Sequence, residues 1–207
     1  MDNYEILPLF STPVFVGHIS IDCKPILNTI VKLKYLKYNN SGKGSENEQV
    51  LELEELLVLK KQIDKKFEVY LYDILMYQKN SNFYFKHETS WVNLHQKNEY
   101  SPMHYHQNSM YSFIFYVDVD ENSGDIIFSC GNKSTFSYNC FDVPVSSYNI
   151  FNSGQWKINP RNNMIIMFPS HLSHCVTESK SKKDRYSIAG NYFCRGSIIN
   201  RTKKLEL

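Results

Sequence analysis

One stretch of the chain decides the fold: residues 103–130 read MHYHQNSMYSFIFYVDVDENSGDIIFSC. Runs of aromatic and β-branched residues, which favour strands, are interrupted there by turn residues such as Glu121-Asn-Ser-Gly. The stretch predicts three strands, at 103–106, 110–119 and 125–130. A strand at 103–106 places His104 and His106 on one face, because successive side chains of a strand alternate between faces.

Similar segments continue on both sides of this stretch. Further strands are expected at 83–96, 135–141, 164–168, 174–177 and 186–194. Turn residues such as Asn159-Pro-Arg-Asn-Asn separate them. Many short strands with turns between them indicate a β-sandwich or a jelly roll.

The first part of the chain follows a different pattern. After an extended segment at 9–17, apolar residues recur at helical spacing over 24–38 and again over about 48–77. The long second stripe predicts a single helix that packs against a sheet, although it could also mediate a homodimer. Between the two helices, the Gly- and Ser-rich segment 39–47 is expected to be a mobile loop.

Length and composition limit the class of protein. The chain has 207 residues, enough for a sizeable core, and its 42% hydrophobic and 14% aromatic content excludes a disordered chain. The formal net charge of +2 does not indicate nucleic acid as a partner. Without repeats or a second domain, residues 1–207 are predicted to form one domain, with a helical support over about 1–80 and a β core over about 81–197.

The location is expected to be cytoplasmic, or the host cytoplasm if the source is a virus. The five cysteines show no paired short spacing, which fits free thiols in a reducing compartment. The first residues have neither the basic nor the apolar region of a secretory signal. No apolar stretch approaches the roughly 18 residues that cross a bilayer, so no membrane partner is expected.

His104, His106 and a distant third histidine, His174, form a candidate metal site. A His-x-His pair alone is more often a surface feature than a ligand pair. His174, at the start of another expected strand, adds a third imidazole. Imidazole suits iron, zinc, copper or nickel, and three protein ligands leave open the positions that a catalytic metal needs.

Arg185 and Ser187 offer a carboxylate site beyond that metal. On a strand their side chains share a face, so that a guanidinium and a hydroxyl could bind one carboxylate, the guanidinium through two hydrogen bonds. The alternative is an exposed arginine at the end of a lysine-rich loop. Their position after His174 in the same β-rich half favours the binding interpretation.

Together these motifs resemble the 2-oxoglutarate/Fe(II)-dependent oxygenase superfamily. The residues that carry the resemblance are Trp91-x-Asn93, His104-x-His106, Ser112 to Tyr116, Ser123-Gly-Asp-Ile-Ile-Phe128, Phe168-Pro-Ser-x-x-x-His174 and Arg185-x-Ser187. They are most similar to a branch of small oxygenases, from bacteria and tailed phages, with a His-x-His…His metal motif. The resemblance covers the second half of the chain well and the first half loosely.

The resemblance implies a mainly β fold, a double-stranded β-helix (jelly-roll, cupin-like) core supported by N-terminal helices. Its implied metal is Fe(II), bound by His104, His106 and His174. Its implied co-substrate is 2-oxoglutarate, whose distal carboxylate Arg185 and Ser187 would bind. The implied activity couples decarboxylation of 2-oxoglutarate to hydroxylation of a substrate that the sequence does not select.

Asn93, Tyr116 and Asn191 are further candidates near the site, since each could hydrogen-bond the co-substrate or a ligand histidine. His95 falls on the same strand face as Asn93 and could also reach the site. His171 could line the pocket or be a backup ligand, although a loop position is favoured. His18 and His87 are expected at the surface.

His106 departs from the superfamily pattern, which has a carboxylate as the second ligand. Three neutral ligands would leave the iron more positive, whereas a non-ligating His106 would leave two histidines. Phe113 also stands where the family has a glycine. The alternative function is therefore a cupin-like or degenerate metal-binding jelly-roll protein without 2-oxoglutarate chemistry, such as a viral accessory protein.

Overall fold

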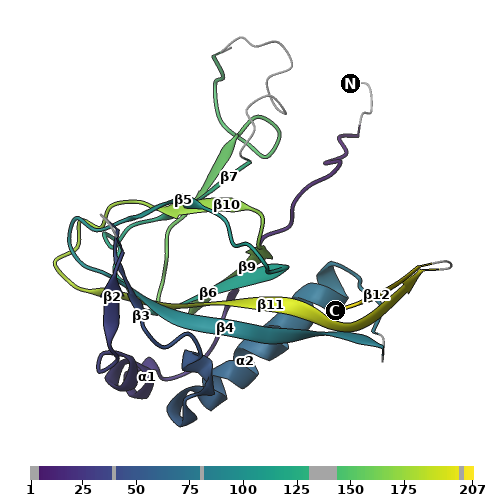
Figure 1. Cartoon of the computed structure of the whole chain (residues 1–207). Coiled ribbons are helices and arrows are strands. Elements are labelled where there is room, and N and C mark those ends of the chain that lie inside the picture. Colours follow the sequence, from purple (N-terminus) through teal and green to yellow (C-terminus); the bar gives the residue numbers. More distant parts are fainter. Residues whose placement is uncertain (1–4, 39–40, 80–81, 131–143, 201–202) are drawn as a thin grey trace.

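Two antiparallel sheets face each other, and helices cover the outer face of the larger sheet (Figure 1). The computed structural model describes residues 5–38, 41–79, 82–130, 144–200 and 203–207. The larger sheet has the strand order β1-β9-β6-β11-β4-β3-β2, with β12 paired to β11, and the smaller sheet has the order β5-β10-β7-β8. The predicted mainly β, jelly-roll fold is confirmed.

The elements run along the chain in the order β1 (Phe15–His18), α1 (Cys23–Ile30), β2 (Tyr35–Lys37), β3 (Lys43–Ser45), η1 (Val50–Glu52), η2 (Glu54–Leu56), α2 (Leu57–Glu68), η3 (Val69–Ile74), β4 (Phe83–His95), β5 (Ser101–His104), β6 (Tyr111–Asp118), β7 (Ile126–Ser129), β8 (Gln155–Ile158), β9 (Met164–Pro169), β10 (Ser173–Val176), β11 (Arg185–Asn200) and β12 (Lys203–Glu206). Two of the short helical elements, η1 and η2, are 3₁₀ turns, and η3 is a π-helix.

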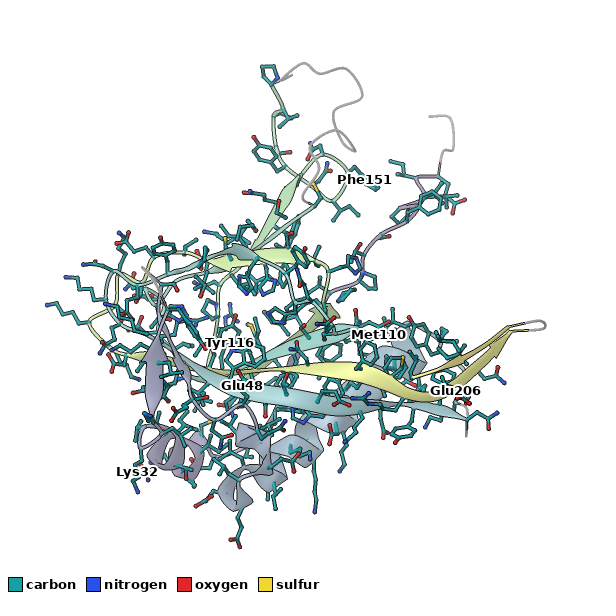
Figure 2. The ribbon with its side chains drawn as sticks, viewed as in Figure 1. Lys32, Glu48, Met110, Tyr116, Phe151 and Glu206 are labelled. Atoms are coloured by element: carbon teal, nitrogen blue, oxygen red, sulfur yellow. The ribbon has the colours of Figure 1, made fainter. Side chains whose placement is uncertain are left out.

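The larger sheet separates two hydrophobic cores. On β6, Phe113 and Phe115 belong to the core under the helices, whereas Ile114 and Tyr116 belong to the core between the sheets. Figure 2 shows Tyr116 in the space between the two sheets. Burial on both faces explains why β6 is a continuous apolar run instead of an alternating one.

The helical predictions for the first part of the chain were only partly right. The first helix ends at Ile30, and Tyr35–Lys37 forms β2 instead. The predicted long helix is divided into η1, η2, α2 and η3. Contacts with β4 override its helical pattern, because Ser90 pairs with Gln49 in a bridge and its hydroxyl accepts the Leu51 N–H at 3.0 Å.

The segment expected to be a mobile loop contains β3, which pairs with β2 and β4. Its glycines are buried and allow close packing. A Cβ at Gly44 would lie 2.5 Å from the Tyr38 ring, and one at Gly42 would lie 2.6 Å from the His95 ring. The glycines that predicted a mobile loop therefore allow the backbone to approach the Tyr38 and His95 rings closely.

Several further expectations have different outcomes. The strand predicted at 135–141 lies outside the described residues, while β8 and β12 were not predicted. The division into a support over about 1–80 and a core over about 81–197 stays a prediction, and the support also contributes β1, β2 and β3 to the larger sheet. Among the described helices, none has the length and apolar character to cross a membrane. The cytoplasmic location and the homodimer stay predictions.

The predicted packing of the long stripe against a sheet is confirmed for α2. Leu59, Ile63 and Phe67 are buried in the core under the larger sheet. The Phe67 ring stacks on Tyr192 of β11 with 3.7 Å between ring centroids. This contact joins the helix to the strand that carries Arg185 and Asn191.

Replacement of Phe67 by alanine should destabilise the protein by about 3–5 kcal/mol, because it leaves a cavity between α2 and β11. Val58 lies on the same helix with 61% of its surface exposed, so that Val58→Ala should change stability by less than about 0.5 kcal/mol. Urea unfolding measures both variants. Equal losses would contradict this account of α2.

Candidate metal centre

Three histidines meet on the smaller sheet, as the sequence predicts. His104 at the end of β5 pairs directly with His174 on β10. His106 follows just beyond β5, where its N–H donates to the Ser170 carbonyl at 2.9 Å. The ring nitrogens of the three side chains that could bind a metal lie within 4.8 Å of one another.

The hydrogen bonds of the three rings fix which nitrogen is free. The Nδ1 atoms of His104 and His174 lie 2.7 and 3.0 Å from the carbonyl oxygens of Pro102 and Leu172. The Nδ1 of His106 lies 2.8 Å from Oδ1 of Asn191. These oxygens only accept hydrogen bonds, so each Nδ1 carries the proton and each Nε2 keeps a lone pair for a metal.

His106 is held by a polar network that reaches across the larger sheet. Besides Asn191, its Nδ1 lies 2.8 Å from the Ser112 hydroxyl, which donates to the same Asn191 oxygen at 2.8 Å. Ser112 also contacts the Ser170 hydroxyl at 2.8 Å. Such outer contacts orient a ligand imidazole and fix its tautomer. The imidazole of His106 is therefore oriented, with its tautomer fixed for metal binding, as are those of the other two histidines.

Burial keeps the imidazoles of His106 and His174 neutral. Burial lowers the pKa of His174 to about 3, with a smaller contribution from the charge of His104. Burial also lowers the pKa of His106. Only a neutral imidazole can bind a metal, so His106 and His174 are in their ligating form without any need to lose protons first.

Arg185 lies fully inside the protein without an acidic partner. Its side chain is 1% exposed, and no carboxylate among the described residues forms an ion pair with it. The guanidinium lies over the Tyr116 ring at 5.2 Å and donates to the Ser187 hydroxyl at 3.3 Å. Within the described part of the chain, Arg185 Nε and Tyr116 OH are both buried without a hydrogen-bond partner. Burial lowers the pKa of Arg185 and raises that of Tyr116.

His95 orients this guanidinium. Arg185 Nη1 donates to His95 Nδ1 at 3.1 Å, and the opposite ring nitrogen, Nε2, lies 2.8 Å from the Ser101 hydroxyl. Burial, followed by the charge of Arg185, lowers the pKa of His95 to about 3. The neutral ring therefore accepts from Arg185 while it donates to Ser101. His95 was expected to reach the site, but its role in holding Arg185 was not predicted from the sequence.

The register of β11 brings these groups to one face. Arg185 pairs with His95, Ser187 with Asn93 and Tyr116, and Asn191 with Ser112. Alternate residues of β11, β4 and β6 thus point into the space between the sheets. The same pairing that places the guanidinium also places the amide that holds His106.

The family match agrees with this arrangement. Residues 89–191 match the family model described as "Putative 2OG-Fe(II) oxygenase". Through this region the chain belongs to the 2OG-Fe(II) oxygenase family. The matched region contains His104, His106, His174, Arg185 and Asn191. No curated protein sequence matches the chain.

Solved structures with the same fold are distant in sequence. A prolyl hydroxylase from Trichoplax adhaerens, in complex with a hypoxia inducible factor peptide, has a TM-score of 0.61 at 13% identity, over 89% of this chain and 85% of that one. A prolyl-4-hydroxylase from Pseudomonas putida has a TM-score of 0.58 at 11% identity, over 91% and 96%. HygX from Streptomyces hygroscopicus, with nickel, 2-oxoglutarate and hygromycin B bound, has a TM-score of 0.58 at 9% identity, over 87% and 82%. These likenesses show the fold.

The remaining candidate residues of this oxygenase-family chain are Asn93 and the histidines outside the triad, and their contacts explain their positions. Asn93 accepts from the Trp91 indole at 3.1 Å. His18 and His171 are exposed, as expected. His87, expected at the surface, is buried at 8% exposure beside Phe113 and Tyr192, because its position on β4 faces the helices. That expectation was wrong.

The phenylalanine that replaces the family's glycine also has a structural explanation. A Cβ at Gly190 of β11 would lie 2.5 Å from the Phe113 ring. The ring therefore occupies the space that a glycine leaves open on the neighbouring strand, on the face turned toward the helices. Ser101, Ser112 and Ser170, which support the site, were not assigned roles from the sequence, because an isolated serine gives no spacing pattern.

Acid should destabilise the metal-free protein through buried neutral His95. In the unfolded chain this imidazole takes up a proton near pH 6.5, whereas in the folded protein it does so only near pH 3. The unfolded state thus binds more protons between these values, and stability falls as the pH drops. The urea midpoint should be lower at pH 5 than at pH 7.5.

His95→Gln keeps a hydrogen-bonding side chain that does not titrate in this range, so the variant should lose less stability between pH 7.5 and pH 5. The matched control is His18→Gln, at an exposed position, which should behave like the parent protein. If His95→Gln and His18→Gln show the same dependence on pH, His95 is not held neutral by the fold.

Proposed function

We propose that this protein is an Fe(II)- and 2-oxoglutarate-dependent oxygenase that hydroxylates its substrate. The observation that carries the proposal is the buried Arg185 guanidinium, which has no anionic partner among the described residues and lies beside Tyr116. A buried unpaired charge is costly, and a bound carboxylate would offset that cost. A cupin-like metal protein without 2-oxoglutarate chemistry would have no use for it.

The co-substrate fits the unsatisfied groups. A carboxylate between the sheets could accept from Arg185 Nε and from Tyr116 OH, two buried atoms that have no hydrogen-bond partner among the described residues. Ser187, already within 3.3 Å of the guanidinium, adds a hydroxyl. Charge-assisted hydrogen bonds of this kind give both affinity and a fixed orientation. His95 would keep the guanidinium in place.

The metal fits the three free Nε2 atoms. His104, His106 and His174 would hold Fe(II) and leave the remaining positions open. When bound, the metal and 2-oxoglutarate together supply an oxidant that couples decarboxylation to oxidation of a C–H bond. His106 in place of a carboxylate makes the ligand set neutral, which distinguishes this centre from the usual facial triad.

Aromatic residues of this chain shield the histidines of the site and hold their rings in position. His174 packs against Phe168 and Phe128, with ring centroids 4.8 and 5.9 Å apart, which keeps water from the inner side of the centre. Trp91 packs on His106, with 5.5 Å between the ring centroids. A pocket of about 470 Å³ reaches His104 and His106 there. The substrate would enter through this pocket.

The proposal is tested by titration of 2-oxoglutarate into anaerobic protein loaded with Fe(II), followed by the visible charge-transfer band. Arg185→Met should weaken 2-oxoglutarate binding by about 30-fold or more while Fe(II) still binds. Because it removes an unpaired buried charge, the same variant should also raise the stability of the metal-free protein. His174→Ala should abolish the binding of both.

The control is Arg195→Met, because Arg195 is partly exposed and pairs with Glu88 away from the site. It should leave 2-oxoglutarate binding unchanged. Fe(II) binding without any 2-oxoglutarate binding, in protein with Arg185 intact, would overturn the proposal in favour of the metal-binding jelly roll.

Asn191→Ala should weaken Fe(II) binding by about 10–100-fold, because it removes the acceptor that fixes the His106 tautomer. Isothermal titration under anaerobic conditions measures this change, with Asn159→Ala at an exposed position as the control. Unchanged affinity in Asn191→Ala would indicate that His106 does not ligate the metal.

A further inference from the structure

The pocket beside the histidines has an acidic and aromatic wall. Among the described residues that line it are Tyr38, Glu48, Trp91, His104 and His106. Among the described residues that line the pocket, Glu48 is the only acidic one. No lysine or arginine among the described residues lines the pocket. Its field therefore favours a cationic or neutral guest over an anionic one.

Among the described residues, none forms an ion pair with the Glu48 carboxylate. Its backbone carbonyl accepts from the Ser90 N–H at 2.8 Å, which fixes the residue at the start of the segment before η1. Within the part of the chain that the structure describes, the carboxylate itself forms no ion pair. Its acidic neighbours along the chain differ, since Glu46 pairs with Lys34 and Glu52 with Lys60. The negative charge of Glu48 is available to a ligand.

The two aromatic rings are held in position by contacts that leave the pocket open. Trp91 donates its indole N–H to Asn93 at 3.1 Å, and its ring packs on His106. Tyr38 lies directly against Gly44, where any side chain would collide with its ring. Aromatic faces attract ammonium groups, and a nearby carboxylate adds to the attraction.

We propose that Tyr38, Trp91 and Glu48 bind a protonated amine or quaternary ammonium group of the substrate. This inference rests on the proposed function, because it assigns the substrate class of the same site. The ammonium group at the acidic wall would hold a neighbouring C–H bond on the His104 and His106 side. The positive charge of Arg185 lies inside the protein, so the two ends of the site select ligands of opposite charge.

The test uses fluorescence and two probes of the same shape, choline and its uncharged isostere 3,3-dimethylbutan-1-ol. The chain has two tryptophans, so Trp156→Phe leaves Trp91 as the sole reporter, in the pocket. Titration of this protein, without metal or 2-oxoglutarate, should give choline a dissociation constant about tenfold lower than that of the isostere. Glu48→Gln should weaken choline about fivefold and leave the isostere unchanged.

The matched control is Glu46→Gln, an exposed acid two residues away that pairs with Lys34, and it should leave both dissociation constants unchanged. Urea midpoints of all variants show that each is folded. Equal affinity for the two probes, no binding of either, or no loss of choline affinity in Glu48→Gln would overturn the inference. Since neither metal nor 2-oxoglutarate is present, this outcome is separate from a failure of 2-oxoglutarate to bind through Arg185.

Discussion

The register of β11 is the constraint on which the site depends. β11 lies between β4 and β6 in the larger sheet and pairs with both. Its inward residues include Arg185, Ser187 and Asn191, while Ile188 and Tyr192 face the helices. A shift by one residue would exchange the two faces, bury the guanidinium against the helices and remove the amide from His106. The apolar outward side chains prevent that shift, so the helical core holds the chemistry in place.

The polar groups of the site divide into those that the protein satisfies and those that it does not. Each histidine of the triad has an acceptor for its Nδ1, so the protein itself completes this set. Arg185 Nε and Tyr116 OH, in contrast, are buried without partners in the part of the chain that the structure describes. Buried polar groups in proteins are almost always hydrogen-bonded, and exceptions have an explanation. A ligand carboxylate is the explanation that fits both atoms and the charge.

Much of the fold and of the site could be predicted from the sequence. Runs of aromatic and β-branched residues between turn residues predicted the long strands, and the expected His-x-His pair does meet His174. The positions of single side chains could not be predicted in the same way. His106 lies beyond the end of β5 and is placed by Ser170 and Asn191, far away in sequence. The prediction that His106 lies beside His104 and His174 was therefore right, but hydrogen bonds from distant residues place it, not the alternation of side chains along a strand.

The errors have a common cause, which is that tertiary contacts override local pattern. The predicted long helix is interrupted where Ser90 binds Leu51, and the predicted loop is a strand because its glycines admit Tyr38 and His95.

The most direct measurement of the central claim is a crystal structure with Fe(II) and 2-oxoglutarate, grown without oxygen. The account predicts iron on His104, His106 and His174, with the distal carboxylate on Arg185 and Tyr116. Iron on two histidines, or a carboxylate bound away from Arg185, would contradict it.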